Sequence, residues 1–367
     1  MSTFITRLDS SGDGVRLAVK DLIDIEGVPT TAGSRAVADD AKPAEADAPC
    51  MAGARAAGAR IVGKVNLHEL ACGSTGLNPW FGNPINPLDP SLVPGGSSSG
   101  SAVAVATDEA DVAYGSDTGG SVRMPSACCG TTGLKTTWGR VSLDGVWPLA
   151  PSLDTIGPMA RDMAGVILGM QLLEPGFAVA PAAATTLGRV GLESEPAIVA
   201  ALDAALGASE LKVEDVDLPG WFTAFGAAGA ALAGEAYLSN QHLDRSKISD
   251  DVNSILEIGT GVDDAAREQG RVAQEEWKRE LSAMFERVEL LVLPTMPIFP
   301  PKVDEEADVL RMVSGCIPVN LAGVAALALP VPCPAGPASL QLVGPHGSEE
   351  LLCATGLVLE AAVRSLQ

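Results

Sequence analysis

Two glycine- and serine-rich segments in the first third of the chain contain residue types that can catalyse bond cleavage. The first, at residues 96–100, reads GSSSG and matches the pattern G-x-S-x-G. A nucleophile elbow of this type needs a strand directly before it and a histidine partner later in the chain. The residues before it, DPSLVPG, contain too much proline for a central strand. We therefore disfavour an elbow built on this segment.

The second segment, DTGGS at residues 117–121, opens with the tripeptide of aspartic proteases. That chemistry needs two such carboxylates sharing a proton, and the chain has no second D-T-G or D-S-G. A phosphate cradle in the first segment would lack the lysine that follows the last glycine of a P-loop. The three histidines, His68, His242 and His346, have no metal-ligand spacing, so we expect no metal site.

Composition narrows the possible partners. The 367 residues carry a formal net charge of -22, whereas phosphate-rich surfaces are bound by clustered lysine and arginine. We therefore expect no direct contact with nucleic acid and no membrane partner. No segment is apolar for long enough to span a bilayer, and the N-terminus does not read as a signal peptide. Seven scattered cysteines, among them the adjacent Cys128 and Cys129, favour reduced thiols in a cytoplasmic protein.

The predicted strands and helices alternate, which places the chain in the α/β class. We expect a single domain over residues 1–367, with a mixed β-sheet covered by helices on both faces. An alternating strand over 15–19 ends at Lys20, and a buried strand over 111–116 leads into the second glycine-rich segment. We place the catalytic core at about 15–160 and a helical, substrate-pocket part at about 161–367. The other predicted helices cover 47–60, 101–107, 161–175, 196–207, 223–243, 262–288 and 349–366, and the other strands cover 61–66, 288–294 and 337–344.

The sequence around both segments resembles the amidase signature family. The resemblance rests on PGGSSSGSAVAVA at residues 94–106 and on GSDTGGSVRMPSACCGTTGLKTTWGRVS at residues 115–142. The stretch LAVKDLIDIEGVPTTAGS at residues 17–34 resembles the family's lysine segment, and most of the chain follows the family in collinear order. The resemblance implies the amidase signature fold, amide hydrolysis, and neither a cofactor nor a metal.

The same resemblance implies a Ser-Ser-Lys triad formed by Lys20, Ser97 and Ser121. Ser121 is the nucleophile and must lose its proton as it attacks a carbonyl carbon. Lys20 is the base, which requires a neutral amine and therefore a desolvated lysine. Ser97, whose preceding peptide bond is cis in the family, relays the proton between them. The reaction passes through an acyl-enzyme on Ser121.

The loop before the nucleophile supplies the second catalytic element. Backbone N–H groups of this loop are expected to form an oxyanion hole, and the donors are those of Thr118, Gly119, Gly120 and Ser121. Ser98 is expected to support the triad by hydrogen bonding. Asp117 and Arg123 flank the loop, and we expect them to pair structurally rather than to react.

Two departures from the family bear on function. Lys20 lies close to the N-terminus, where family members carry several dozen further residues, so we expect an open pocket or a homodimer or partner chain that covers it. In the glutaminase component of tRNA-dependent amidotransferases, an aspartate before the I-P-x-N-L-A-G segment holds the amino group of glutamine. Val313 stands at the matching position here and argues against that role.

These observations predict an amidase that hydrolyses the C–N bond of a small carboxamide. Its expected partner is that small-molecule amide, with a homodimer possible. The first alternative is the glutaminase-type subunit of a tRNA-dependent amidotransferase. The second is a non-catalytic binding protein on the same fold, which the retention of Lys20, Ser97 and Ser121 disfavours.

Overall fold

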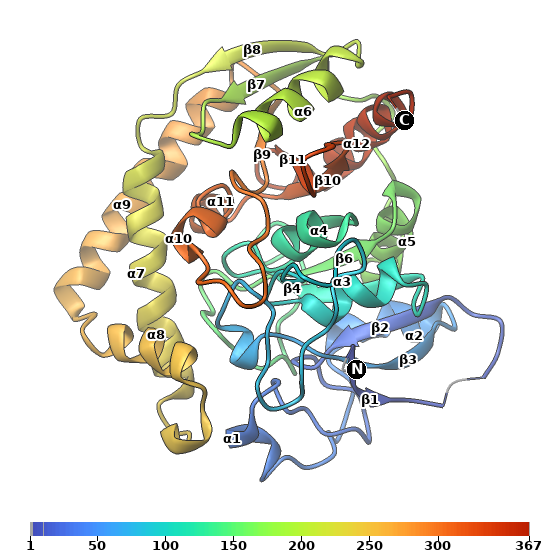
Figure 1. The fold of residues 1–367 in the computed structure, drawn as a ribbon, viewed down its shortest axis with the longest axis vertical. Coiled ribbons are helices and arrows are strands. Elements are labelled where there is room, and N and C mark those ends of the chain that lie inside the picture. The colour runs from blue at the N-terminus through green and yellow to red at the C-terminus, as the bar shows by residue number, and fades with distance from the viewer. Residues whose placement is uncertain (1–2, 10, 367) are drawn as a thin grey trace.

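One mixed sheet runs through the whole molecule (Figure 1). The computed structural model describes residues 3–9 and 11–366. The sheet contains β1 (Phe4–Arg7), β2 (Arg16–Lys20), β3 (Arg60–Val65), β4 (Val112–Ser116), β5 (Thr132–Lys135), β6 (Ile156–Ala160), β7 (Thr186–Val190), β8 (Lys212–Val216), β9 (Leu290–Pro294), β10 (Ala326–Val331) and β11 (Ala338–Val343).

The strand order is β1-β3-β2-β4-β6-β5-β10-β11-β9-β7-β8. Strand β2 is parallel to both β3 and β4, whereas β4, β6, β5, β10, β11 and β9 pair antiparallel in succession. Because β5 pairs with β10, the two halves of the chain share one sheet. The parallel register of β2 and β4 aligns Val19 with Tyr114, so the carboxyl ends of these strands meet at one edge. Lys20 and Ser116 are the last residues of those two strands.

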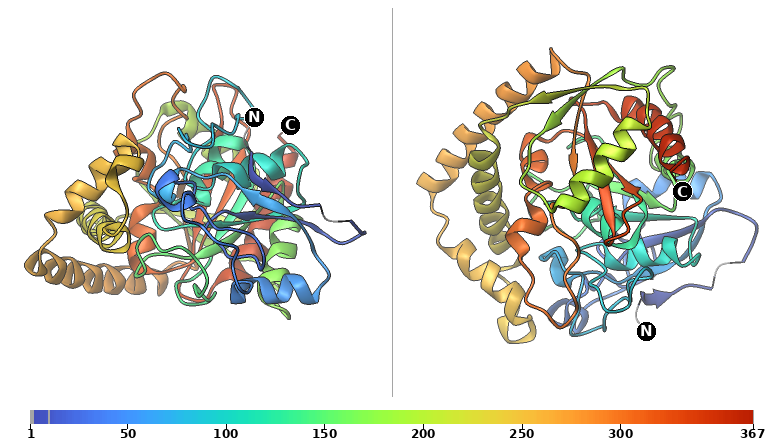
Figure 2. Two further views of the ribbon diagram at one scale, coloured as in Figure 1. Left: turned by 90° about the horizontal axis from the view of Figure 1, so that it is seen from below. Right: turned by 45° about the horizontal axis from the view of Figure 1, so that its top comes forward.

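Helices cover both faces of the sheet (Figure 2). They are α1 (Arg35–Ala38), α2 (Ala52–Ala56), α3 (Ser99–Ala106), α4 (Arg123–Cys129), α5 (Met163–Leu173), α6 (Pro196–Gly207), α7 (Trp221–Asn240), α8 (Asp250–Thr260), α9 (Asp264–Phe285), α10 (Val309–Val313), α11 (Ile317–Ala322) and α12 (Glu349–Arg364). No helix of the described residues is both long and apolar enough to cross a membrane.

Alternation along the strands divides the core between the two faces. Leu17 and Val19 of β2 pack with α2 and α5, while Ala18 between them packs with Ala104 and Val105 of α3. Farther along the sheet, α5, α6 and α12 pack on one face of β10 and β11, and α4 also contacts both strands. Helices α7, α9 and α11 form a second cluster with β9 and the ends of β10 and β11. The predicted α/β class, with one mixed sheet between helices, is confirmed.

Helices α7, α8 and α9 form an arm along one side of the molecule (Figure 1). Trp277 of α9 is buried, lies edge-on to Trp221 of α7, and donates its indole N–H to the Pro318 carbonyl at 2.8 Å. Helix α7 also packs on α11. The arm is thereby fixed to the segment that precedes β10.

Candidate active site

Lys20 is buried at the point where β2 ends, and two serine hydroxyls surround its amine. Nζ lies 2.7 Å from Ser97 Oγ and 2.8 Å from Ser116 Oγ. Burial lowers the pKa of Lys20 to about 7, against the opposing attraction of the carboxylates of Asp117 and Asp154. The neutral amine is therefore well populated near neutral pH, which is the state that a base requires.

The backbone beside Ser97 is hydrogen-bonded to that of Ser121 through the neighbouring residue Ser98. The Gly96–Ser97 peptide bond is cis. The Ser97 carbonyl accepts the His68 N–H at 3.0 Å, and the Ser98 N–H donates to the Ser121 carbonyl at 3.2 Å. Ser97 is fully buried, whereas Ser121 keeps 6% of its surface exposed. Of the two predicted reacting serines, Ser121 is thus the one that retains some exposed surface.

Ser98 supports the site without touching the lysine. Its hydroxyl donates to the Ser116 carbonyl at 3.1 Å. Because Ser116 also pairs with Ile156 in the ladder between β4 and β6, its backbone is held on both sides. Ser98 therefore acts on the position of Ser116, the second neighbour of Lys20.

The loop before Ser121 is curled around a buried carboxylate. Asp117 accepts the backbone N–H of Gly120 at 2.8 Å and that of Val122 at 3.0 Å. Gly120 has φ +121°, and a Cβ added there would lie 2.6 Å from Cys316 Cβ, so this position requires glycine.

This arrangement changes the set of free oxyanion donors. The Gly120 N–H, one of the four that we predicted, is already bonded to Asp117. The N–H groups of Thr118, Gly119 and Ser121 have no partner among the described residues. The oxyanion hole remains a prediction, and these three amides are its available donors.

Asp117 and Arg123 form a fully buried ion pair, with Nη2 and Oδ1 2.9 Å apart. Burial alone would raise the pKa of Asp117, but attraction to Arg123 outweighs it and holds this pKa well below its usual range. The guanidinium also contacts Asn320 Oδ1 at 2.5 Å and Gln341 Oε1 at 2.6 Å. The pair is therefore braced from α11 and β11 and presents no reactive group to a substrate.

Sequence reasoning missed Ser116, Asp154 and Asn320. Asp154 is buried, accepts the Thr118 hydroxyl at 2.6 Å and the Leu149 N–H at 3.0 Å, and thereby ties the catalytic loop to residues 149–154. Burial raises the pKa of Asp154. Each of two of these residues is a polar side chain in an otherwise apolar run, which is a signal that sequence analysis could have used. Ser116 ends the run VAYGS, and Asn320 lies within IPVNLA.

The surroundings of the catalytic loop are apolar. A Cβ added at Gly119 would lie 3.3 Å from a Leu232 methyl group of α7 and 3.5 Å from Ile317 of α11. Val313 ends α10, is partly buried, and packs in the same clusters as Ile317 and Cys316. Side chains from the second half of the chain therefore cover the loop that carries Ser121.

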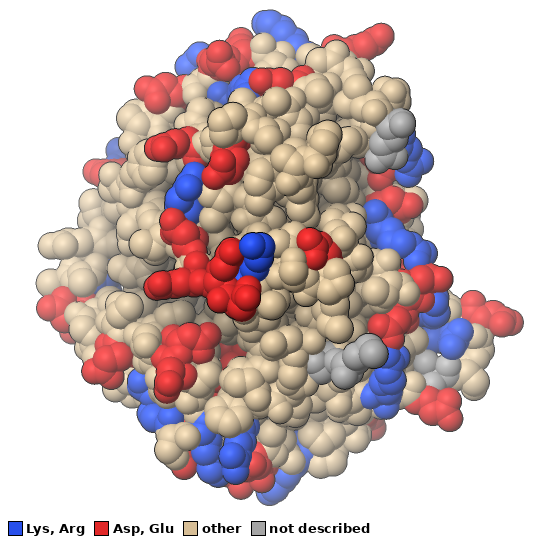
Figure 3. Space-filling view, viewed as in Figure 1, with Lys and Arg blue, Asp and Glu red and all other residues tan. Residues whose placement is uncertain are grey.

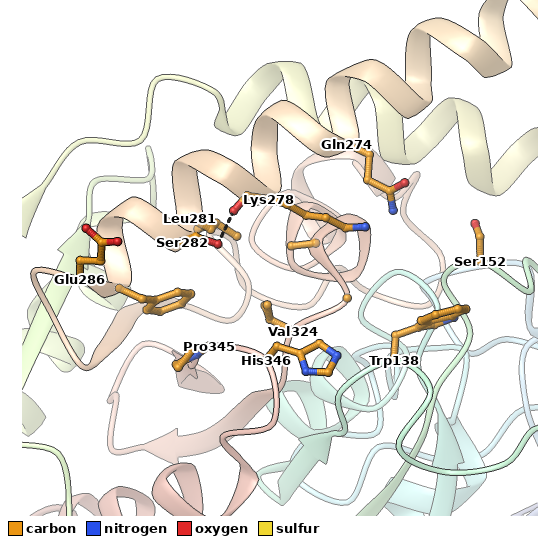
Figure 4. Close-up of a pocket in the computed structure, with 13 residues that line it drawn as sticks. Trp138, Ser152, Gln274, Lys278, Leu281, Ser282, Glu286, Val324, Pro345 and His346 are labelled. Atoms are coloured by element: carbon orange, nitrogen blue, oxygen red, sulfur yellow. Dashed lines mark hydrogen bonds between the residues drawn. The ribbon is translucent and has the colours of Figure 1, made fainter.

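A cavity of about 770 Å³ lies elsewhere, between α9 and the loops that follow β5 and β11 (Figure 4). Trp138, Lys278 and His346 point into it, and none of its lining residues belongs to the predicted catalytic set. In the described part of the chain, no three His, Cys, Asp or Glu side chains are grouped so that they could hold a metal ion.

Comparison with known proteins defines the class. The family model described as Amidase matches residues 9–175 and 221–353. The chain belongs to this amidase family, whose members act on amide C–N bonds, and the predicted recognition and enzyme class are confirmed.

Individual relatives narrow the assignment. The chain is 33% identical over 424 residues to a glutamyl-tRNA(Gln) amidotransferase subunit of Halobacterium salinarum, covering 98% of this chain and 99% of that protein. It superposes on a crystal structure of an amidase with TM-score 0.89 and 31% identity, covering 95% and 84% of the two chains. It also superposes on the corresponding glutamyl-tRNA(Gln) amidotransferase subunit of Thermotoga maritima with TM-score 0.84 and 27% identity, covering 97% and 86%.

These relatives correct the predicted partners. We expected a small-molecule amide as the partner, no direct contact with nucleic acid, no membrane and a possible homodimer. That prediction is wrong, because the matched relatives are subunits of an amidotransferase named for glutamyl-tRNA(Gln). The comparisons favour the alternative, a component of that amidotransferase, over hydrolysis of a free carboxamide, although Val313 argues against it.

Proposed function

We propose that this chain is the amide-cleaving subunit of a glutamyl-tRNA(Gln) amidotransferase, which releases ammonia for use by a partner protein. The observation that carries the proposal is similarity over nearly the whole chain to relatives of that name, together with a buried lysine beside Ser97. The proposal includes a cytoplasmic location, where charged tRNA is used.

Ser121 Oγ attacks the carbonyl carbon of the donor amide, and its proton passes through Ser97 to Lys20. The resulting oxyanion is stabilised by the N–H groups of Thr118, Gly119 and Ser121, each worth on the order of 3 kcal/mol. The C–N bond then breaks, and the leaving nitrogen takes the proton back from Lys20 through Ser97. Ammonia leaves, and water hydrolyses the acyl-enzyme on Ser121 by the same proton path.

Glutamine is the donor that the resemblance to the glutaminase branch implies. Val313 brings no carboxylate to the position that holds the amino group in that branch. We therefore expect the isolated chain to bind glutamine weakly.

The test combines the purified chain with the partner proteins and glutamyl-tRNA(Gln) of the same organism. With glutamine carrying ¹⁵N in its side-chain amide, we expect the label to appear in glutaminyl-tRNA. Ser121→Ala should abolish the transfer. Ser101→Ala should preserve it, because the buried Ser101 hydroxyl bonds the Tyr114 carbonyl and no other group among the described residues.

Two results would contradict the proposal. The first is a failure of the chain to associate with the partner proteins. The second is an assembled complex that transfers no nitrogen although Ser121 is still sulfonylated by a sulfonyl fluoride. In the second case Ser121 is a nucleophile that serves another reaction.

A further inference from the structure

The amine of Lys20 has a second neighbour that the triad does not include. Ser116 Oγ lies 2.8 Å from Nζ, nearly as close as Ser97 Oγ at 2.7 Å. Lys20 is completely buried and forms no ion pair among the described residues. The immediate surroundings of the amine are therefore two hydroxyls without a contacting carboxylate, a set that suits a neutral amine.

A neutral amine has one lone pair and two N–H groups, so its rotation about the Cε–Nζ bond decides whether it can act as a base. If an N–H faces Ser97, the lone pair is turned away and cannot accept the relay proton. A fixed acceptor on another side of the nitrogen takes one N–H and leaves the lone pair free for Ser97. Serine has that acceptor capacity.

We propose that Ser116 is a positioning residue for catalysis, which accepts an N–H of Lys20 and thereby directs the amine lone pair at Ser97. The inference rests on the proposed role of Lys20 as the base.

The position of Ser116 suits this task because its backbone is held on both sides. Its carbonyl accepts the Ser98 hydroxyl at 3.1 Å, and its residue pairs with Ile156 across the ladder of β4 and β6. Ser116 is 4% exposed, so little water competes for its hydroxyl. The parallel pairing of β2 with β4 places the base and this acceptor at the same sheet edge.

Ser116 also acts after the proton has moved. Once Lys20 becomes an ammonium ion, all three of its N–H groups are donors, and the Ser116 hydroxyl remains an acceptor for one of them. A hydrogen bond to the charged form favours that form. Loss of this hydroxyl should therefore lower the pKa of Lys20. It should also leave the amine free to rotate, so that its lone pair no longer faces Ser97.

The experiment follows sulfonylation of Ser121 by phenylmethylsulfonyl fluoride with intact-mass spectrometry, across about pH 5.5 to 9. In this reaction the Oγ–S bond forms, the S–F bond breaks, fluoride leaves, and the hydroxyl proton passes through Ser97 to Lys20. The readout needs no knowledge of the donor amide. In the unmodified chain the rate should rise with pH through about 7, as Lys20 loses its proton.

For Ser116→Ala we expect the plateau rate to fall by about tenfold to a hundredfold, part of the usual contribution of a general base. The midpoint should also move to lower pH. Ser116→Thr, which keeps the hydroxyl, should restore both the rate and the midpoint. The matched control is Ser101→Ala, which removes a buried hydroxyl that contacts the backbone of the same strand but not Lys20.

A slower Ser116→Ala variant with an unmoved midpoint would overturn the proposal, since a merely structural role changes the rate alone. Equal behaviour of Ser116→Ala and Ser101→Ala would overturn it as well, while Ser121 remains the nucleophile. If Ser121 of the unmodified chain is not sulfonylated at any pH, both this inference and the proposed role of Ser121 as nucleophile fail. Retained thermal stability of both alanine variants excludes misfolding as the cause.

Discussion

At the scale of single residues, Lys20, the proposed base, also lowers the stability of the fold, because it is buried. Its unfolded form holds a proton up to about pH 10.5, whereas the folded form releases it near 7. Between these values the unfolded state binds more protons, so stability rises with pH across this window. Below about pH 7, the folded state has to bury the charged ammonium group of Lys20.

We therefore expect Lys20→Met to abolish acylation of Ser121 and yet to stabilise the fold near pH 6. The gain should be about 1–3 kcal/mol, because a tenfold change in proton affinity corresponds to about 1.4 kcal/mol and lost hydrogen bonds offset part of it. Urea unfolding at pH 6 and at pH 9 measures this. A gain that is equally large at both values would contradict the explanation.

Val313 provides a test of donor recognition at the same scale. Placing a carboxylate there by Val313→Asp should lower the KM for glutamine by about tenfold or more, as expected for one charge-assisted hydrogen bond. Asparagine has nearly the same shape as aspartate but carries no charge, so Val313→Asn should change the KM for glutamine little. If the two variants behave alike, the carboxylate at this position is not what holds the amino group.

At the scale of elements, the catalytic loop depends on a network shared between segments far apart in the sequence. Asp117 organises the loop between β4 and α4, and Arg123 connects it to Asn320 of α11 and Gln341 of β11. All four side chains are buried. The loop's shape is therefore set by tertiary contacts rather than by its own residues alone.

Asp117→Asn should be strongly destabilising, by about 3–5 kcal/mol, because it leaves the guanidinium of Arg123 buried without its counter-ion. The double variant Asp117→Asn with Arg123→Met should recover part of this loss. Chemical denaturation of both single variants and the double variant measures the coupling. Additive losses would show that the pair is not an energetic unit.

How much of this could be predicted differs between elements. Strand β2 ending at Lys20, helix α6 over 196–207 and the core of α12 followed from periodicity, and the resemblance named Lys20, Ser97 and Ser121. Strand β10 was missed because its sequence, ALALPV, contains a proline. Its partners β5 and β11 enforce the strand nevertheless, a tertiary effect that local sequence does not reveal.

The predicted helix over 47–60 shows the opposite error. It consists of a 3-10 turn over Pro49–Met51 and the short α2, because Gly58 has a positive φ and the chain then enters β3.

Ser116 and Asp154 were missed for a different reason. Their roles depend on which strands are neighbours, and strand order was not part of the prediction.

At the scale of the whole molecule, the excess of negative charge shapes stability. Figure 3 shows acidic side chains spread over the face viewed, with fewer basic ones among them. A net charge of -22 makes the folded state repel itself, and salt screens that repulsion over a Debye length of about 10 Å at 0.1 M.

We expect the melting temperature to rise as potassium chloride is increased from about 0.1 M to 1 M, where the Debye length falls to about 3 Å. Differential scanning fluorimetry measures this, with sucrose at matched osmolality as a control for non-ionic effects. A melting temperature that falls or stays constant with salt would contradict the role assigned to self-repulsion.

The pairing of β5 with β10, and the contacts of Arg123 with Asn320 and Gln341, have a consequence for how the protein is made. A ribosome releases Lys20, Ser97 and Ser121 long before it adds the residues that brace the loop between β4 and α4. A nascent or truncated chain that stops before β11 carries all three residues of the proposed triad but lacks the contact between Arg123 and Gln341. We therefore expect amide-cleaving capacity to appear only after β11 has been synthesised.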